Sequence, residues 1–401
     1  MFDAGVAAVR ADACLPTHLP PDRPRGRNVL LAVGKAAGDM AAVAVRHRHF
    51  DAGLVIMPDG GLPPGAALPP QIATVFAAHP VPDARSEQAG QRALALARGL
   101  TAGDRLVALV SGGGSALIVA PRPPLTLADK MAITQQLLAA GAPIGDINRL
   151  RRHLSLIKGG GLAMAAAPAD VCTLVLSDIP GDDAALVASG PTCPMAPDDD
   201  WRALAARWGV ALPAALDARG DRPAPDRPNP APPRCIGHGG MALDAMAAVA
   251  AAAGYAVINL GAAIEGDAQA IARAQAAQAL DEAAAGRRTA LISGGETSVV
   301  VSGQGRGGRN QCYAAALAQA LAGHPAICAF AADSDGIDGN SDAAGALVLP
   351  DTLARLAALG LDMAQLLAAS NSAHGFAQLG DAIVTGPTFT NVNDLRAILV
   401  G

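Results

Sequence analysis

The chain has 401 residues, of which 51% are hydrophobic, 16% charged and only 2% aromatic, and its formal net charge is −5. This composition supplies the apolar surface for a large core and excludes a wholly disordered chain. The negative charge and the scarcity of aromatic rings argue against nucleic-acid binding, which relies on basic faces and stacking rings.

The composition and the chain's beginning also indicate a compartment. The six cysteines form no Cys-x-x-Cys pair and lie mostly in apolar stretches. Free thiols in a reducing compartment are therefore expected rather than disulfides or zinc. Residues 1–20 lack the apolar segment of a signal peptide, and the Ala-rich stretch after Met241 is interrupted by glycines. We expect a cytoplasmic protein that binds neither membranes nor nucleic acid.

The first half of the chain alternates apolar stretches of strand length with helix-length segments rich in Ala and Leu. Strands are predicted at residues 28–33, 54–57, 72–76, 105–110 and 171–176. Helices are predicted after Lys35 and at residues 85–100, 126–140 and 146–157. Strands that are apolar throughout, alternating with helices, are typical of a parallel sheet covered on both faces.

A proline-rich segment, RPAPDRPNPAPP at residues 222–233, separates the two halves. Proline lacks an N–H group and fixes φ, so this segment is neither an internal helix nor a central strand. We interpret residues 223–233 as a linker between an N-terminal Rossmann-like α/β domain (1–222) and a C-terminal α/β domain (234–401).

After this segment the alternation resumes. Helices are predicted at 241–253, 267–285 and 309–321, and strands at 255–260, 290–293, 297–302, 326–331 and 381–384. The fold expected is two α/β domains with mainly parallel, Rossmann-like sheets.

An apolar run leads into Ser-Gly-Gly twice, at Ser111 and at Ser293. In an open parallel sheet, ligands bind beyond the carboxyl ends of the strands, and backbone amides at a glycine turn can hold an anion. We therefore predict an anion site at residues 112–115, with a tight connection that binds nothing as the alternative. The second turn, at residues 294–297, is the weaker signal.

A G-x-G-x-x-G pattern at Gly303, Gly305 and Gly308 lies between a predicted strand and a predicted helix. This context is that of a dinucleotide-binding fingerprint, which keeps a nicotinamide-dependent dehydrogenase open as an interpretation. Arg306 and Arg309 favour instead a highly charged phosphate tail or a carboxylate.

Lysine is rare: only Lys35, Lys130 and Lys158 occur among 30 basic residues. Lys35 follows a predicted strand at a helix start, where its ammonium group can reach a phosphoryl oxygen. Lys158 ends a predicted helix that carries Arg149, and its alternative role is to complement the helix dipole. Lys130 is expected to be solvated.

Two acidic clusters follow predicted strands, one containing Asp178 and Asp182 and the other Asp335 and Asp338. Carboxylates at strand ends suit Mg²⁺ ligation or the removal of a proton from a substrate hydroxyl. Capping of the next helix is the alternative role.

Several motifs, in a distinctive order, cover nearly the whole chain: GKAAGDM, HPVPD, SGGGSAL, INRLRRHLSLIKGGGLA, SDIPGDD with ASGPT, GGETSVVVSGQGRGGRNQ, DSDGIDGNSDAAGA and TGPTFTNVNDL. Together they resemble the class II glycerate 2-kinase family, whose C-terminal part is the MOFRL domain. The resemblance implies transfer of phosphate from ATP to the 2-hydroxyl of D-glycerate, a divalent cation such as Mg²⁺, and a site in a cleft between the domains. Family members have also been labelled hydroxypyruvate reductase.

The resemblance also implies site residues. The motifs match Lys35 and an arginine of residues 305–309 to the catalytic cations, and in our working mechanism these are Lys35 and Arg309, assisted by Arg306. The sequence does not rank the four acids Asp178, Asp182, Asp335 and Asp338 as base or metal ligand, and we take Asp178 and Asp335 as candidates for the base. Asp182 and Asp335 are the candidate metal ligands. Residues expected to bind substrate or nucleotide are Gly112, Gly113, Gly114, Ser115, Arg149, Lys158, Gly294, Gly295, Glu296, Asn310 and Asp338.

Two positions depart from the family pattern. Cys312 stands where the family usually has an acid, so we exclude it from the site, and Ser334 replaces the usual threonine before Asp335. The alternatives to the kinase are an NAD(P)-dependent hydroxypyruvate reductase and a non-catalytic phosphosugar- or glycerate-binding protein. A homodimer is also allowed for.

Overall fold

The computed structural model describes residues 1–23, 25–194, 200–213, 216 and 231–401, so the predicted linker lies mostly outside the described residues. The chain forms two compact units. Unit 1 contains Met1–Ala13, Asp178–Asp182 and Gly237–Gly401, and unit 2 contains Cys14–Ser177 and Asp183–Ile236. The division at residues 222 and 234 stays a prediction, but it differs from these units in assigning residues 1–13 and 178–182 to the N-terminal domain.

Unit 2 is built on a six-stranded sheet in the order β3-β2-β1-β4-β5-β6. The strands are β1 (Asn28–Val33), β2 (Ala52–Met57), β3 (Ile72–Phe76), β4 (Arg105–Val110), β5 (Asp170–Leu176) and β6 (Arg234–Gly237). The pairs β1–β2, β2–β3, β1–β4 and β4–β5 are parallel. This is the strand order of a Rossmann-like sheet, and it confirms the predicted fold class for this unit.

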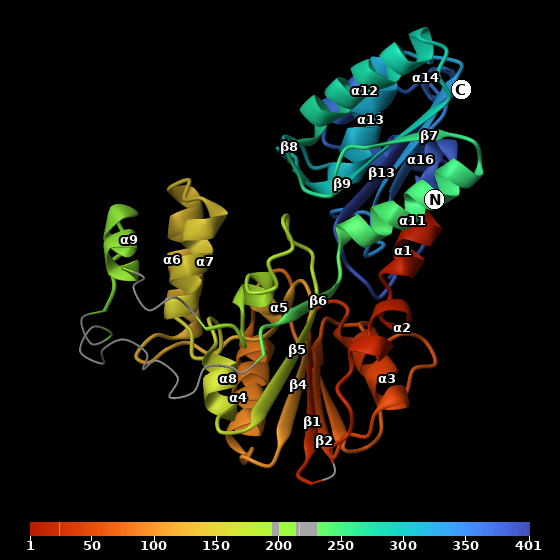
Figure 1. Cartoon of the computed structure of the whole chain (residues 1–401). Coiled ribbons are helices and arrows are strands. Elements are labelled where there is room, and N and C mark those ends of the chain that lie inside the picture. The colour runs from red at the N-terminus through yellow and green to blue at the C-terminus, as the bar shows by residue number, and fades with distance from the viewer. Residues whose placement is uncertain (24, 195–199, 214–215, 217–230) are drawn as a thin grey trace. The chain divides into compact units, whose positions relative to one another are not determined.

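Helices cover both faces of this sheet (Figure 1). Those of unit 2 are α3 (Ala37–His47), α4 (Ala84–Arg98), α5 (Gly114–Leu117), α6 (Leu127–Ala139), α7 (Ile144–His153), α8 (Gly161–Ala166), α9 (Trp201–Arg207) and the short 3₁₀ helices η1 (Pro16–His18) and η2 (Val187–Ser189). Helix α3 lies on one face, and α4 and α8 lie on the other. Helices α6, α7 and α9 form a separate cluster around the buried Trp201.

Capping side chains define where the longer helices of unit 2 begin. Asp83 caps α4 and Thr126 caps α6, each in a reciprocal capping box with the residue three positions later. Each such cap satisfies backbone N–H groups that the first turn leaves unpaired. These sequence-local signals explain why the predicted starts lie within one residue of the observed ones.

Unit 1 contains a seven-stranded sheet in the order β12-β11-β10-β13-β9-β7, with β8 also paired to β9. The strands are β7 (Ala256–Asn259), β8 (Ile264–Asp267), β9 (Thr289–Ser298), β10 (Ile327–Asp333), β11 (Gly345–Val348), β12 (Ala382–Ile383) and β13 (Asp394–Val400). Only β7 and β8 run parallel to β9, whereas β13 is antiparallel to both β9 and β10. The expectation of a mainly parallel second sheet is therefore wrong, because the last strand of the chain inserts between β9 and β10.

Two apolar clusters hold helices on the two faces of this sheet (Figure 1). The helices are α1 (Phe2–Ala8), α11 (Gly239–Ala252), α12 (Ala268–Ala284), α13 (Arg309–Leu321), α14 (Thr352–Ala358), α15 (Met363–Ala368) and α16 (Ser372–Leu379). The short helix α2 (Ala11–Cys14) spans the boundary between the two units. Helix α1 packs with α11 on one face through Phe2 and Val6, and α12 and α13 contribute many alanines to the other cluster. The apolar side of α1 explains why residues 1–13 belong to unit 1.

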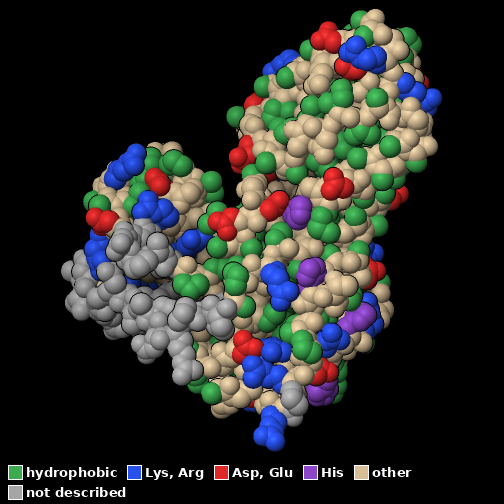
Figure 2. Space-filling view, viewed as in Figure 1, with side chains coloured by type: hydrophobic (Ala, Val, Ile, Leu, Met, Phe, Trp, Pro, Cys, Tyr) green, Lys and Arg blue, Asp and Glu red, His purple; other side chains and the backbone are tan. Residues whose placement is uncertain are grey.

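Two surface properties follow from the described residues. On the face shown in Figure 2, basic and acidic side chains are interspersed with uncharged surface on both units. Over the described ranges, no helix combines the length and the apolar character needed to cross a membrane.

The second Ser-Gly-Gly sequence forms no turn, which corrects the prediction of two short strands. Strand β9 continues through Gly294 and Gly295, where β13 pairs on one side and β8 is parallel to it on the other. Gly295 has φ +120°, and a Cβ there would lie 2.3 Å from the backbone nitrogen and oxygen of Ile264. Glycine is needed for the close approach of strands rather than for a turn.

Gly266 provides a matched test of this interpretation, because its φ is +124° but a Cβ there would meet only Ile271, at 3.6 Å. We expect Gly266→Ala to lower the free energy of unfolding by about 1–2 kcal/mol through backbone strain alone. Gly295→Ala should cost at least about 2 kcal/mol more, because the methyl group also overlaps β8. Urea titrations followed by circular dichroism would measure both, and equal losses would contradict the close-approach explanation.

Candidate functional site

The carboxyl ends of β1 and β4 form the switch point of the unit 2 sheet. Val33 and Val110 are paired at the ends of these two strands. The chain moves outward from β1 to β2 and β3, and then returns to place β4 on the other side of β1. The loops that follow β1 and β4 diverge at such a point, and in open α/β sheets this is where ligands bind.

The loops after β1 and β4 touch through their backbones. The backbone nitrogen of Lys35 donates to the carbonyl oxygen of Gly112 at 2.8 Å, and that of Ala36 donates to Ser111 Oγ at 3.1 Å. Gly34 has φ +128°, and a Cβ there would lie 2.1 Å from Ser111 Oγ. The glycine therefore permits the contact that fixes Lys35 beside the glycine loop.

Lys35 and His79 both flank Gly113. Gly113 has φ +78°, and a Cβ there would lie 3.0 Å from His79 Cδ2 and 3.2 Å from Lys35 Cγ. Gly114 is also closely packed, because a Cβ there would lie 2.7 Å from that of Ala188. The structure thus places Lys35 and His79 beside the glycine loop at residues 112–115.

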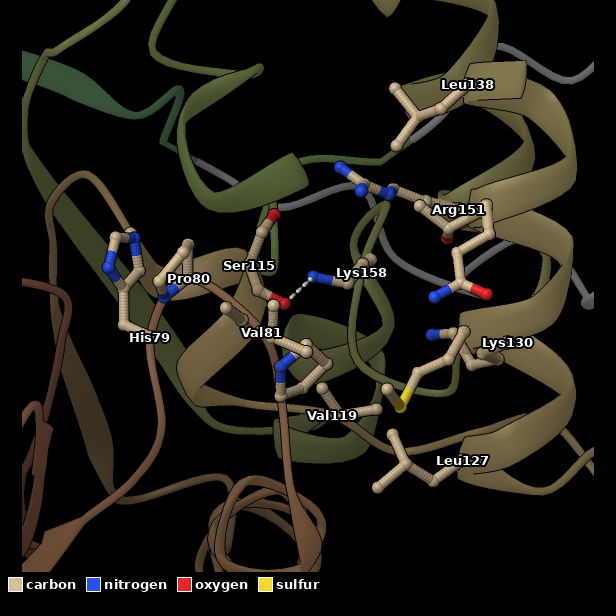
Figure 3. A pocket seen from close by; sticks show the side chains of 16 residues that line it. His79, Pro80, Val81, Ser115, Val119, Leu127, Lys130, Leu138, Arg151 and Lys158 are labelled. Atoms are coloured by element: carbon tan, nitrogen blue, oxygen red, sulfur yellow. Dashed lines mark hydrogen bonds between the residues drawn. The ribbon is translucent and has the colours of Figure 1, made fainter. Parts of the chain in front are cut away.

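A pocket of about 390 Å³ in unit 2 includes Gly113 and Ser115 in its wall (Figure 3). Its basic side chains are Lys130, Arg151 and Lys158. No acidic side chain occurs among the described residues that line it. The prediction that Lys130 is solvated is wrong, because this lysine is buried and faces the pocket.

Lys158 lies at the base of the pocket with a side chain that is almost fully buried. Its Nζ donates to the carbonyl oxygen of Ser115 at 2.8 Å, as the dashed line in Figure 3 shows. Burial lowers the pKa of Lys158 well below its usual value, and the positive charges of Lys130, Arg151 and Arg152 lower it further. An anion in the pocket would stabilise all of these charged groups.

Arg149 lies on α7 with an exposed side chain and is not part of the pocket wall. Arg151, two residues further on, lines the pocket, and the expected role of Arg149 in binding substrate or nucleotide stays a prediction.

In unit 1, three carboxylates surround Arg309 at the start of α13. Arg309 Nε donates to Asp394 at 2.8 Å, one terminal nitrogen donates to Asp333 at 2.9 Å, and the other donates to Glu296 at 2.6 Å. The Asp394 side chain is completely buried, whereas that of Glu296 is 47% exposed. Burial alone would lower the pKa of Arg309, but the charges of Asp394, Asp333 and Glu296 raise it overall. The predicted cation is therefore held firmly by acids.

Asp338 and Asn310 support Arg309 from inside the fold. The Asp338 carboxylate accepts from the backbone nitrogens of Asn310 at 3.0 Å and Gln311 at 2.8 Å, which caps the first turn of α13. Burial raises the pKa of Asp338 to about 6. Asn310 Nδ2 donates to Asp394 at 2.7 Å. Both side chains are buried, and these contacts give them a structural role, while their expected contact with substrate or nucleotide stays a prediction.

The G-x-G-x-x-G segment is covered by the chain itself. A Cβ at Gly303 or Gly305 would lie 2.3–2.4 Å from atoms of residues 369–371. A Cβ at Gly308 would lie 2.2 Å from Asp338 Oδ1. A dinucleotide fingerprint instead leaves its glycine face open for the pyrophosphate. These glycines therefore serve internal packing.

The remaining predicted acids contact different residues of unit 1. Asp178 accepts from Asn391 Nδ2 at 3.3 Å, and Asp182 lies 3.4 Å from His238 Nδ1. The Asp335 carboxylate accepts from the backbone nitrogen of Ile337 at 2.9 Å. Within the described ranges, no group of three or more His, Cys, Asp or Glu side chains could hold a metal ion. The residues do not fit a metal held by the protein alone, so the predicted metal pair of Asp182 and Asp335 gains no support.

Arg306 pairs with Asp342 at 2.9 Å through a side chain that is 58% exposed. It also donates to the carbonyl oxygen of Asn340. This pair is open to solvent and therefore weak. Of the two predicted catalytic arginines, Arg306 is thus the one whose side chain lies mainly in solvent.

Two family descriptions match the chain: a domain of unknown function, DUF4147, over residues 1–219, and the MOFRL family over residues 289–394. A D-glycerate 2-kinase from Thermotoga maritima is 34% identical over 377 residues, which are 92% of this chain and 89% of that protein. The chain belongs to the glycerate kinase family. A crystal structure of glycerate kinase from the same organism matches with a TM-score of 0.90 at 32% identity, covering 100% of this chain and 97% of the other.

Another relative in this family carries a different name. An Agrobacterium vitis protein provisionally named as a hydroxypyruvate reductase is 43% identical over 413 residues, covering 100% of this chain and 93% of that protein. The resemblance stated from the motifs is confirmed, and the two names match the two enzyme interpretations of the sequence. The cleft expected between the domains stays a prediction.

The sequence analysis did not assign several residues that the fold brings to the unit 2 pocket or to Arg309 in unit 1. His79, Lys130 and Arg151 lie at the pocket, and Asp333 and Asp394 hold Arg309. His79 and Asp394 are within quoted motifs, and Lys130 is one of three lysines, so signals existed for all three. Asp333 lies near Asp335, and Arg151 lies beside Arg152, so the sequence alone gives no reason to choose either residue over its neighbour.

Asp394 is the shared acceptor of the polar network around Arg309 in unit 1. It accepts hydrogen bonds from Arg309, Asn310, Thr297 and the buried Arg396. We expect Asp394→Asn to destabilise unit 1 by about 3–5 kcal/mol, because buried arginine charge is left uncompensated. Asp342→Asn, at an acid 88% exposed and paired with Arg306, is the control and should change stability by less than about 0.5 kcal/mol. Hydrogen exchange of the β9 and β13 amides would measure the difference, and comparable protection in the two variants would refute it.

Proposed function

We propose that the protein transfers the γ-phosphoryl group of ATP to the 2-hydroxyl of D-glycerate, giving 2-phosphoglycerate and ADP. The observation that carries this proposal is the contact of the Lys35 backbone with the glycine loop at the switch point, beside a pocket lined by basic and no acidic described side chains. Membership of the glycerate kinase family supports the same reaction.

Phosphoryl transfer depends on positioning and charge neutralisation more than on covalent chemistry. The 2-hydroxyl oxygen of glycerate attacks the γ-phosphorus in line, the bond from that phosphorus to the β–γ bridging oxygen breaks, and the hydroxyl proton leaves. Backbone amides of residues 112–115 would bind phosphate oxygens. The Lys35 ammonium group would compensate negative charge on the transferred group.

Arg309 would have a different part in this reaction. Its guanidinium group has five N–H donors, and Asp333 and Asp394 hold two of its nitrogens through largely buried carboxylates. Glu296, its third partner, is much more exposed and can be replaced. We propose that an anionic oxygen of a substrate takes the place of Glu296 on this nitrogen.

Several finer assignments belong to the same proposal. Asp178 and Asp335 are the candidates for accepting the hydroxyl proton, and Mg²⁺ would arrive with ATP as part of the substrate complex. A cytoplasmic enzyme agrees with the six free cysteines. The homodimer stays a prediction.

The reductase is the second candidate because of the Agrobacterium relative's name. Its predicted cofactor site is the glycine segment at residues 303–308. The space over these glycines, which a dinucleotide would occupy, is filled by residues 369–371 and Asp338. That packing favours the kinase. A non-catalytic binding protein would use the same loops and is distinguished from the kinase by turnover.

We expect the purified protein to release ADP and form 2-phosphoglycerate when given D-glycerate and MgATP. Hydroxypyruvate with NADH or NADPH should cause no loss of nicotinamide absorbance. Coupled detection of ADP and direct spectroscopy would measure the two reactions. Nicotinamide oxidation without ADP release would establish the reductase, and neither reaction would favour the binding protein.

Replacing Lys35 tests the proposed charge compensation. Lys35→Met should lower kcat by about 10²–10³-fold, because a preorganised cation at the transferred group is lost. Arg92→Met, at an exposed position on α4, is the control and should leave kcat within about twofold. An unchanged kcat in the folded Lys35 variant would remove Lys35 from the mechanism.

A further inference from the structure

Two apolar walls of the unit 2 pocket face each other. Phosphoryl transfer needs cations and backbone amides, so it does not account for these apolar side chains. Leu127, Met131 and Leu138 come from α6, and Pro80 and Val81 come from the loop after β3. Figure 3 shows His79, Pro80 and Val81 on one side, the α6 side chains on the other, and Ser115 and Lys158 between them. The pocket is thus a slot with apolar sides.

The pocket face of α6 is distinct from the face that packs into the core. Ile133 and Leu137 are buried in the cluster with α7 and α9. Leu127, Met131, Thr134 and Leu138 recur at three- and four-residue spacing and line the pocket instead. Leu138 is 59% and Val81 is 61% exposed, so apolar surface is available for a ligand.

The basic side chains add a second requirement on the ligand. Lys130, Arg151 and Lys158 all line the same pocket. Gly113, also in the wall, is the residue flanked by Lys35. A suitable ligand therefore combines a flat apolar part with several negative charges. D-glycerate has three carbons and a single carboxylate, so it would neither cover the apolar walls nor balance these cations.

We propose that this pocket binds the nucleotide, with the base between α6 and residues 80–82 and the phosphates directed along Lys130 and Arg151 toward Gly113 and Lys35. The inference rests on the proposed function for the identity of the nucleotide. It assigns the nucleotide to unit 2 and makes Lys130, Met131 and Arg151 binding residues for it.

Calorimetric titration with ADP, without glycerate or turnover, tests the site directly. Lys130→Met keeps the aliphatic stem but removes the charge, and its Kd for ADP should rise at least about tenfold. Thr134→Trp should fill the slot and abolish binding. Ala132→Trp, on the exposed face of the same helix, is the matched control and should bind ADP as the parent does. Parent-like ADP binding in both Lys130→Met and Thr134→Trp would overturn the proposal.

Two further comparisons separate this inference from its alternatives. Inorganic tripolyphosphate should bind at least about tenfold more weakly than ATP, because it lacks the base; equal affinity would overturn the assignment of the apolar slot. In turnover, Lys130→Met should raise KM for ATP about tenfold with KM for glycerate within twofold, and the reverse split would assign the pocket to glycerate. ADP binding that responds to these variants in a protein without kinase turnover would support the site while rejecting the proposed function.

Discussion

Gly34 and Ser111 lie so close that a Cβ at residue 34 would overlap the serine hydroxyl, and the position of Lys35 beside the glycine loop depends on this contact. The strand order places β1 and β4 side by side at the switch point, so the loops that follow them must meet before they diverge. Backbone hydrogen bonds then fix Lys35 and Ala36 against residues 111 and 112. The main chain of Lys35 is therefore held beside the glycine loop by its own backbone hydrogen bond.

Arg309 illustrates the opposite way of placing a cation. Its three nitrogens donate to three acids, and Asp394 and Asp333 are themselves largely buried. A buried ion pair is kept only when further hydrogen bonds satisfy its members, and here Asn310 supplies one of them. This arrangement fixes the guanidinium plane but surrounds it with negative charge. Glu296 is the most exposed of the three acids.

Parallel strands buried on both faces produce uninterrupted apolar runs, which is why β1 and β4 were predicted with their observed bounds. The unit 1 sheet could not be predicted this way. Strand β13 pairs with β9 across about a hundred residues of sequence, and the nearest local signal, the 294–295 glycines, reads as a turn. The candidate site divides similarly: Lys35 and residues 112–115 were recognisable from strand ends, whereas Lys130 and Arg151 needed α6 and α7 to be folded against the loop after β3.

The three glycine segments show that the space over each Cα decides a motif's meaning. At Gly113 that space borders Lys35 and His79 and opens into a pocket. At Gly295 it is filled by β8, and at residues 303–308 by residues 369–371 and Asp338. Of these three segments, only the one at Gly113 has backbone that lies next to basic side chains and also borders a pocket. A phosphate chain requires both. The G-x-G-x-x-G sequence that suggests a nicotinamide enzyme therefore describes packing inside unit 1, whereas the less specific triple glycine of unit 2 borders a pocket.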